Sequence, residues 1–525
     1  MILFYFCDFL LFVGRKCVIL SILKIKGISD MHYVLGIDVG TTGTKSLLFS
    51  ENGNYVGQAY KGYDLINPRV GISEQRAEDW WDAVVCTVQE VISSAGIEGS
   101  DVVGISLSLQ GGTLVPVGED FEPLANARVW NDARCAAQRQ EYLDEVGDAR
   151  SMYEKTGWSL GNSLLALEIR EMRDNDPALF EKTAMFMSVP DYISYKMTGI
   201  PAIDISDIGI NQTGNVRTGD YDEDLLSFMN ISKDKLPAIV HTGDVIGHLT
   251  EKASAELGLS TDCVLVAGAH DQYAVALGAG CTHDGDIVIG SGTCWVVTAL
   301  SSLPNFDSGI AQSQSATPGL WGSCWSLSSG GVCLDWMRKY VSLSREGDLI
   351  DYDTVNAEVA KRKAAEDGLF FYPFAGCAQD RKAFPKASFI GLDLSHDRFD
   401  MMRAVMEGVC FQIRWMMEYF KSKPSPEEGL KLAGGAAKSA VWCQILSDIT
   451  GLPVRVPELA DLSCVGAAAL AGTGSGLFKD LDEACNRLSV AGHVVNPDPE
   501  RSRIYSELYE VHKSKAVLLS KIYGL

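Results

Sequence analysis

Several signatures of common binding and enzyme classes are missing from this chain of 525 residues. It has no CxxC pair, no GxxxxGK(S/T) loop and no GxGxxG, so a zinc site built on paired cysteines, a P-loop and a dinucleotide-binding loop are not indicated. Basic residues are also scarce, because 45 Lys and Arg stand against 68 Asp and Glu, and the formal charge of −23 argues against a nucleic-acid binder. The 14 cysteines lie scattered, most of them in apolar runs, which is typical of reduced structural thiols in a cytoplasmic enzyme.

The first thirty residues are apolar but lack the features of a targeting segment. Asp8 and the pair Arg15-Lys16 interrupt the run before it reaches the ~20 apolar residues that a membrane span needs. A signal peptide would begin with basic residues and end in small ones, and neither feature is present. We interpret residues 1–30 as an upstream extension from a mis-chosen start codon, with a hydrophobic anchor as the alternative, and Met31 then opens the first domain.

The remaining chain is too long for one core, and we expect two large α/β domains, at 31–283 and 284–525. Two stretches share one design: "VLGIDVGTTGTKSLLFS" (34–50) and "GDIVIGSGTCWVVTAL" (285–300) are each an apolar strand, a Gly/Ser/Thr turn and a second apolar strand. A duplicated half explains the repeat, with each half offering one phosphate-binding hairpin to a shared cleft. Apolar spacing also predicts a helix over 78–96 and a buried helix over 401–420.

The turn of the first hairpin carries groups that suit a phosphate held beside a metal ion. Gly40 and Gly43 relax the limits on the backbone, so the turn can present N–H groups to a ligand that approaches closely. Hydroxyl donors, a cation and a carboxylate come from Thr41, Thr42, Lys45 and Asp38. An ordinary β-hairpin turn is the alternative interpretation.

Asp271 is the strongest candidate for a catalytic group. It follows an apolar strand and precedes a small-residue helix in "VLVAGAHDQYAVALGAG" (264–280). Carboxylates at the C-terminal end of such a strand project into the crevice where α/β proteins bind ligands, and there an Asp can take a proton from a substrate hydroxyl. A helix N-cap is the competing role. The adjacent Gln272 would read a hydroxyl through its amide, and His270 is expected to be a packed or capping residue.

Two further stretches are candidates for ligand contacts. The Gly-Gly turn at 434–435 allows close backbone approach at a helix N-terminus, which suits a nucleotide, although such turns are also often structural. Most tryptophans are core candidates, but Trp130 precedes Asn131 and Asp132 on an expected loop, with a helix opening near these two residues. We therefore place Trp130 against a sugar.

With these stretches in hand, the chain resembles the FGGY family of carbohydrate kinases, in the actin-like ATPase superfamily, from Met31 to the C-terminus. The resemblance rests on ordered motifs that include "GIDVGTTGTK", "WNDAR", "VPDYISYKMTG", "GAHDQYAVALGAG", "GSGTCW", "AGGAAKSAVWCQILSDITGLPV" and "VPELADLSCVGAAALAG". It implies two ribonuclease-H-like domains with a catalytic cleft between them. It also implies transfer of the γ-phosphoryl group of ATP, with Mg²⁺, to a terminal hydroxyl of a small sugar or polyol.

The resemblance assigns roles residue by residue. Asp271 stands where the catalytic base of the family stands, and Asp38 lies on the metal side of the first phosphate loop. Cofactor binding is implied for Gly40, Thr41, Thr42, Lys45, Gly292, Thr293, Gly330, Gly331, Gly434, Gly435, Ala436 and Ser439. Substrate binding is implied for Leu109, Gln110, Trp130, Asn131, Asp132 and Gln272.

The substrate is less clearly indicated. Xylulokinase-like members carry a Met-His pair where this chain has Leu109 and Gln110, and their "GERTP" loop is replaced by "GCAQDRKAFP" around Asp380 and Arg381. Glycerol kinases usually carry an Arg-Glu pair at the first position, so they are not favoured. The stretches "SGTCW", "SFIGLDL" and "AGTGSGLF" look closer to autoinducer-2 kinases, whose Met-Arg-Glu trio is missing near Gln110.

The overall pattern favours a xylulokinase-like ketopentose kinase that converts D-xylulose and ATP to D-xylulose 5-phosphate and ADP. An autoinducer-2 kinase or another polyol or ketose kinase is the alternative, and an actin-like nucleotide-binding sensor is the non-enzyme alternative. Neither a nucleic acid nor a membrane is expected as a partner, and a homodimer is the default expectation for such an enzyme.

Overall fold

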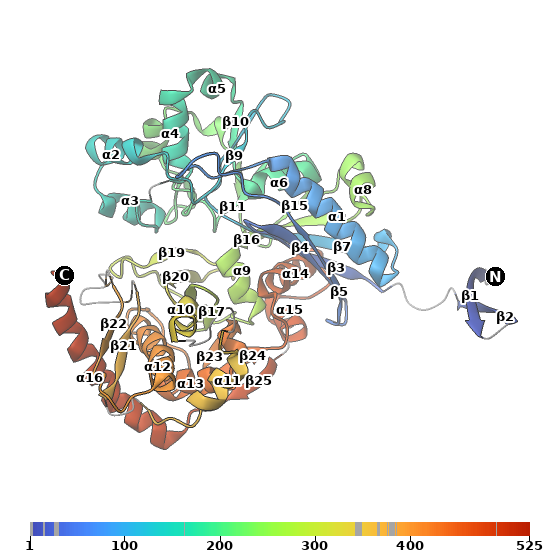
Figure 1. Cartoon of the computed structure of the whole chain (residues 1–525). Coiled ribbons are helices and arrows are strands. Elements are labelled where there is room, and N and C mark those ends of the chain that lie inside the picture. The colour runs from blue at the N-terminus through green and yellow to red at the C-terminus, as the bar shows by residue number, and fades with distance from the viewer. Residues whose placement is uncertain are drawn as a thin grey trace.

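The computed structural model of the chain describes residues 4–13, 16–25, 31–161, 163–341, 349–364, 368–374, 376, 384, 386–489 and 491–525. Near the N-terminus, the strands β1 (Phe4–Val13) and β2 (Lys16–Ile25) pair in antiparallel fashion as a separate two-stranded sheet (Figure 1). The interpretation of residues 1–30 as an upstream extension stays a prediction.

A six-stranded mixed sheet forms the centre of the N-terminal half. Three neighbouring strands, β16, β7 and β3, run parallel to one another, and β4 and β5 continue the sheet in antiparallel fashion. The residues of β3 and β7 are buried almost throughout, as expected for parallel strands covered on both faces. In sheet order the strands are β15 (Val245–His248), β16 (Val264–His270), β7 (Val102–Leu109), β3 (Tyr33–Val39), β4 (Gly43–Ser50) and β5 (Tyr55–Gly62).

The C-terminal half repeats this arrangement in a seven-stranded sheet. Its strands β24, β23 and β17 run parallel, and β18 and β20 follow in antiparallel fashion. Each half therefore has a hairpin whose first strand pairs with a parallel strand, which confirms the predicted repeat of the hairpin design, while its origin in a duplication stays a prediction. The strands are β19 (Ala311–Gln314), β20 (Trp321–Leu327), β18 (Trp295–Ser301), β17 (Ile287–Ser291), β23 (Leu430–Gly434), β24 (Val454–Pro457) and β25 (Ala491–Val495).

Three helices that contact one another pack against the N-terminal sheet. The predicted helix over 78–96 is confirmed as α1 (Ala77–Ala95), which packs on β4 and β5 and ends at Gly96 in the left-handed conformation. Two helices accompany it, α6 (Val189–Thr198) and α8 (Glu251–Leu257).

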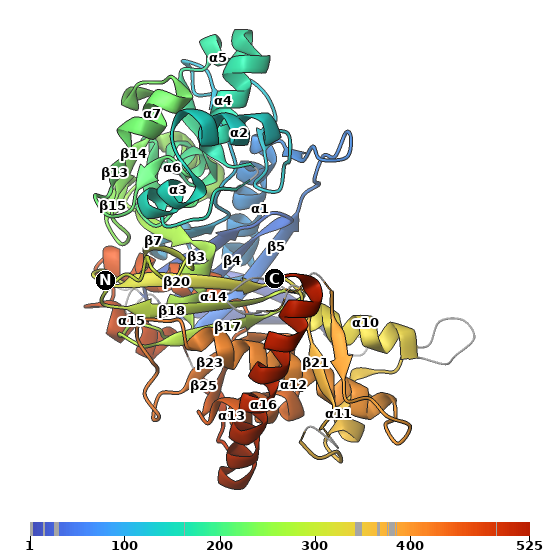
Figure 2. The same cartoon turned by 90° about the vertical axis from the view of Figure 1, so that its left-hand side faces the viewer.

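A layer of helices and short strands lies beyond this sheet, at the top of Figure 2. Its helices are α2 (Ala136–Glu145), α3 (Ala149–Thr156), α4 (Leu165–Asn175), α5 (Pro177–Lys182) and α7 (Glu223–Met229). Its short strands and those beside it are β6 (Glu74–Gln75), β8 (Val115–Val117), β9 (Ala127–Arg128), β10 (Met185–Met187), β11 (Ala202–Asp204), β12 (Gly214–Asn215), β13 (Asp220–Tyr221) and β14 (Ala238–Val240).

Two helices that are far apart in the sequence fill the junction between the sheets (Figure 1). They are α9 (Asp271–Gly278) and α14 (Leu462–Gly474), and α14 packs on β3 and β7 although it belongs to the C-terminal half. Their contact requires glycine, because a Cβ atom at Gly466 would lie 2.0 Å from the carbonyl oxygen of Ala274. The two halves are thus joined by close helix packing.

The largest buried cluster lies in the C-terminal half, around α12 (Arg398–Met417). Seventeen of the 20 residues of α12 are buried, which confirms the predicted buried helix. The remaining helices and strands of this half are α10 (Gly331–Val341), α11 (Tyr352–Val359), α13 (Ala440–Thr450), α15 (Leu481–Leu488), α16 (Pro499–Tyr523), β21 (Phe370–Tyr372) and β22 (Ser388–Ile390). Among the described residues, no helix combines the length and the apolar character needed to cross a bilayer.

Candidate active site

Asp271 lies at the junction of the two halves. It is the first residue of α9, its side chain is 39% exposed, and its Oδ1 lies 3.4 Å from Nδ1 of His270. The N-cap of α9 is His270, so the structure does not show the alternative N-cap role for Asp271. Burial raises the pKa of the Asp38 carboxyl in one sheet and of the Cys324 thiol in the other, and the nearby charge of Asp271 raises both further. A partly open carboxylate therefore lies within electrostatic reach of both sheets.

Asp38 is a partly buried carboxylate near the end of β3. It accepts a hydrogen bond of 2.7 Å from the hydroxyl of Ser108 on β7. Burial raises its pKa to about 6, against an ordinary value of 3.8, and the charge of Asp271 adds to this shift. Two carboxylates that repel each other in this way leave an excess of negative charge, which a divalent cation would neutralise.

The carboxylates of this site fit Mg²⁺ rather than a metal held by protein alone. Among the described residues, no group of three or more His, Cys, Asp or Glu could hold a metal ion. Mg²⁺ is commonly bound through one or two carboxylates, with water and substrate phosphates as the remaining ligands. Asp38 is the residue that suits this role.

The first hairpin turn leaves space beside Asp38. A Cβ atom at Gly40 would lie 3.8 Å from Oδ2 of Asp38, an ordinary contact distance, so this position borders the carboxylate without crowding it. The N–H of Gly40 donates to the carbonyl of Gly43 at 3.1 Å and closes the turn, and Tyr63 donates through its hydroxyl to the Gly40 carbonyl. Thr42 of this turn is exposed to solvent.

Lys45, a predicted phosphate contact, is paired with a carboxylate in this structure, and its contact with phosphate stays a prediction. Its Nζ forms an ion pair with Asp461, which directly precedes α14. A cation that is already paired with a carboxylate leaves little net charge for a phosphate. Lys45 nevertheless lies opposite Asp38 in the register of the β3–β4 hairpin. Its charge partly offsets the rise in the pKa of Asp38 that burial causes.

Three predicted site residues meet beside the first hairpin. The indole N–H of Trp130 donates to the hydroxyl of Thr41 at 3.0 Å, and that hydroxyl donates to Oε1 of Gln110 at 2.8 Å. Trp130 is 49% exposed, so its ring has an open face, and Asn131 beside it is exposed as well. Gln272, next to Asp271, is partly exposed. Gln110, Trp130, Asn131 and Gln272 remain predicted contacts of the sugar, and Thr41 remains a predicted contact of the phosphate.

Two predicted substrate residues have other roles. The side chain of Leu109 is 2% exposed and packs in the core of the N-terminal sheet, so it has no open face for a sugar. Asp132 is 2% exposed and accepts hydrogen bonds from the N–H of Ser73 and from Nε, Nη2 and the N–H of Arg134. Although burial alone would raise the pKa of Asp132, these bonds hold it below its usual range.

Asp132 thus anchors the loop that carries Trp130. Its carboxylate is engaged with Ser73 and Arg134, and α2 begins at Ala136, later than predicted. The guanidinium of Arg134 also reaches Glu74 of β6 at 2.7 Å, which ties the loop to that strand.

A pocket of about 550 Å³ lies on the C-terminal half. It unites six predicted cofactor residues, namely Gly292, Thr293, Gly331, Gly435, Ala436 and Ser439. Four further lining residues, Ser291, Trp295, Lys438 and Trp442, belong to the two motifs around these glycines but had no predicted role, and Leu334, Asp335, Tyr352, Asp353 and Asn356 lie outside every motif. The only sequence signal for the part on α11 is the helical spacing of Tyr352, Asp353 and Asn356.

Hydrogen bonds hold the Gly-Gly turn of this pocket against the second hairpin. The carbonyl oxygen of Ser291 accepts the N–H of Gly435 at 2.7 Å, and the Ser291 hydroxyl accepts the N–H of Ala436 at 3.1 Å. Ser439 caps α13 through the N–H of Trp442 and donates to Oδ1 of Asn356 at 2.7 Å. These bonds fix the walls of the pocket.

Gly330 and Gly434, which were predicted to bind the cofactor, are not among the residues that line the pocket. A Cβ atom at Gly330 would lie 2.1 Å from Cδ1 of Trp295, and one at Gly434 would lie 2.8 Å from the Ser291 carbonyl oxygen. Gly434 also has φ +95°, which favours glycine. Both glycines permit close packing beneath the pocket.

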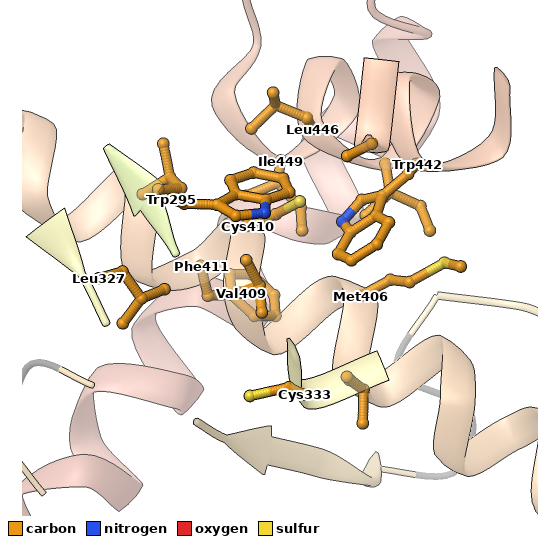
Figure 3. Packing of buried hydrophobic residues seen from close by; sticks show 14 of the residues in the cluster. Trp295, Leu327, Cys333, Met406, Val409, Cys410, Phe411, Trp442, Leu446 and Ile449 are labelled. Carbon is orange, nitrogen blue, oxygen red and sulfur yellow. The ribbon is translucent and has the colours of Figure 1, made fainter. Parts of the chain in front are cut away.

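Trp295 and Trp442 lie against each other in the core below the pocket, with ring centroids 5.3 Å apart (Figure 3). Trp295 is fully buried, and Cys410 and Phe411 of α12 belong to the same cluster. The pocket therefore rests on a rigid aromatic base. The replaced loop around Asp380 and Arg381 lies outside the described residues.

Comparison with known proteins agrees with this arrangement. Residues 33–278 match the N-terminal domain of the FGGY family of carbohydrate kinases, and residues 285–475 match its C-terminal domain. Xylulose kinase from Bacillus subtilis (strain 168) is 27% identical over 493 residues, which are 92% of this chain and 96% of that protein. Gluconokinase from the same organism is 25% identical over 501 residues, or 94% and 97% of the two chains.

The crystal structure of xylulose kinase from Rhodospirillum rubrum matches with a TM-score of 0.85 at 26% identity, and covers 94% of this chain and 100% of that chain. The fold and site define a carbohydrate kinase with two α/β domains, as the sequence predicts. The chain belongs to the FGGY family of carbohydrate kinases. Within that family it is a xylulokinase-like sugar kinase, and members of the family use ATP as phosphate donor.

Proposed function

We propose that the protein transfers the γ-phosphoryl group of ATP, in the presence of Mg²⁺, to a terminal hydroxyl of D-xylulose. The observation that carries this proposal is the position of Asp271, a partly exposed carboxylate between two sheets that each offer a Gly/Thr hairpin. The similarity to xylulose kinases over more than nine tenths of the chain supports the ketopentose as acceptor.

Asp271 acts as the general base in this reaction. As the acceptor oxygen forms its bond to the γ-phosphorus, the bond from that phosphorus to the bridging oxygen breaks and ADP leaves. The hydroxyl proton passes to the Asp271 carboxylate. Mg²⁺, when bound, would supply positive charge to the triphosphate, and Asp38 would hold it.

The nucleotide and the sugar bind in different parts of the molecule. The pocket that contains Gly292 and Gly435 takes the adenosine end, because backbone groups can approach a ligand closely where no Cβ intervenes. The open ring of Trp130 and the neighbouring Asn131 receive the sugar. The two substrates then meet at Asp271, near the boundary that we place between residues 283 and 284.

The proposed setting is the cytoplasm, where ATP is available, and the described cysteines are free thiols, as such a setting favours. A homodimer is proposed as the assembly.

Gluconate is the rival acceptor, because a gluconokinase covers 94% of this chain. A coupled ADP-release assay with D-xylulose, L-xylulose, D-gluconate, glycerol and dihydroxy-pentanedione separates the candidates. We expect the highest kcat/KM with D-xylulose. A higher kcat/KM with gluconate or dihydroxy-pentanedione would reassign the substrate, and nucleotide binding without ADP release from any acceptor would make the protein a sensor.

A further inference from the structure

A closed ring of hydrogen bonds joins the first hairpin to Gln75, a residue without an assigned role. The hydroxyl of Thr41 donates to Oε1 of Gln110 at 2.8 Å, and Nε2 of Gln110 donates to Oε1 of Gln75 at 3.2 Å. Nε2 of Gln75 then donates to the carbonyl oxygen of Thr41 at 2.7 Å. The ring therefore starts and ends on the turn that is predicted to bind phosphate.

Gln75 is held from two further sides. The indole N–H of the buried Trp80 on α1 donates to Oε1 of Gln75 at 3.3 Å. The backbone of Gln75 pairs with Ala127 in the two-stranded β6–β9 sheet. Gln75 is 1% exposed, so its amide stays in one orientation, and each of its polar atoms has a partner.

The ring also reaches the candidate sugar site. Trp130 follows β9 closely in the sequence and donates to the Thr41 hydroxyl at 3.0 Å. Trp130 is half-exposed, whereas Gln75 and Gln110 are buried. A sugar that settles on the open ring of Trp130 would fix the indole, and the indole N–H would fix the hydroxyl of Thr41.

We propose that this ring couples the sugar site to the phosphate-binding turn, with Gln75 as the positioning residue that fixes the Thr41 carbonyl and the Gln110 amide. The inference rests on the proposed function, since it takes Trp130 as a sugar contact and Thr41 as a phosphate contact. Sugar binding orders the turn in advance, so the triphosphate then binds with less loss of conformational freedom. By reciprocity, nucleotide binding tightens sugar binding by the same factor.

The test uses the full chain and three variants. Gln75→Met keeps the side-chain volume and removes the amide, and Trp130→Phe keeps an aromatic face but removes the indole N–H together with one of the two fused rings. The third variant combines both changes. Gln412→Met is the matched control, because Gln412 is a buried glutamine of α12 in the C-terminal half, away from the ring. Its Nε2 lies 3.3 Å from Nε2 of His512.

Isothermal titration calorimetry measures binding of adenosine, and of the ATP analogue AMP-PNP with and without D-xylulose. In the wild type we expect D-xylulose to tighten AMP-PNP binding by at least about fivefold. Gln75→Met should weaken AMP-PNP binding about fivefold without sugar and leave adenosine binding unchanged, since adenosine does not reach the turn. The coupling should fall below about twofold in each single variant, with no further loss in the double variant.

Wild-type affinity for AMP-PNP and full coupling in Gln75→Met would overturn the proposal, as would additive losses in the double variant. If Gln75→Met unfolds where Gln412→Met does not, Trp130→Phe decides, because retained coupling there contradicts the relay and lost coupling supports it. Should D-xylulose fail to bind the wild type, the substrate assignment falls, and the AMP-PNP and adenosine titrations still decide the role of Gln75.

Discussion

Lys45 of β4 and Asp461 form an ion pair between positions 416 residues apart in the sequence. Asp461 leads into α14, which packs on β3 and β7, so the pair fastens this helix to the N-terminal sheet. Burial alone would lower the pKa of Lys45, but the hydrogen bond and charge of Asp461 raise it above its ordinary value of 10.5. The pair therefore stabilises the charged lysine.

Loss of the lysine charge should weaken this junction. We expect Lys45→Met to lower the free energy of unfolding by about 0.5–1 kcal/mol at pH 7, since both side chains are 29% exposed and solvent screens the pair. Because the folded pKa of Lys45 is raised, its contribution is fully present below pH 10.5 and is lost as the pH rises further. Urea unfolding at pH 7 checks this, with the exposed Lys61→Met of β5 as control. Equal effects of the two substitutions would contradict it.

The protonation of Asp38 should control metal affinity at acidic pH. Its folded pKa of about 6 means that the carboxyl is mostly protonated below that pH, and a metal ligand must be ionised. Apparent affinity for Mg²⁺ in ADP-saturated protein should fall about tenfold for each pH unit below 6. In the metal-free protein, the folded state binds more protons than the unfolded state between pH 3.8 and about 6, so the contribution of Asp38 to stability decreases as the pH rises through this window.

Mg²⁺ titrations at pH 5, 6 and 7 measure this dependence. The same titrations on Asp38→Asn give the background from the nucleotide phosphates, which titrate near pH 6 as well. The contribution of Asp38 is the difference in Mg²⁺ affinity between the wild type and Asp38→Asn. A difference that does not change with pH would show that Asp38 is not a metal ligand.

The contact between α9 and α14 should not tolerate a side chain. A Cβ atom at Gly466 would lie 2.0 Å from the backbone oxygen of Ala274, so Gly466→Ala forces the helices apart. We expect a loss of about 1–3 kcal/mol in unfolding free energy. Gly57→Ala on the edge strand β5 is the control, because its Cβ atom would meet Val91 at an ordinary 3.6 Å. Similar urea midpoints for the two variants would disprove the close contact.

Local patterns predicted the elements that depend on neighbours in the sequence. The two hairpins could be predicted because an apolar strand, a glycine-containing turn and a second strand form one continuous stretch, and β3–β4 and β17–β18 confirm them. The helix over 401–420 could be predicted because its apolar residues surround the whole axis, as in the buried α12. The position of Asp271 between a strand and a helix was likewise local information.

The roles of Asp132, Leu109 and Lys45 depended on distant partners. Asp132 is held partly by Ser73, 59 residues earlier, and no local pattern indicates that contact. Whether Leu109 faces the core or a cleft depends on which face of β7 is covered. The partner of Lys45 becomes visible only when α14 packs against the first sheet.

Asp271 provides the most direct test of the account. We expect Asp271→Asn to bind AMP-PNP with wild-type affinity and to lose sugar-dependent ADP release by about 10²–10⁴-fold, since only the proton acceptor is removed. A coupled assay with saturating ATP, Mg²⁺ and D-xylulose measures the rate, and calorimetry measures the affinity. Undiminished ADP release by this variant would contradict the assignment of the base and, with it, the proposed mechanism.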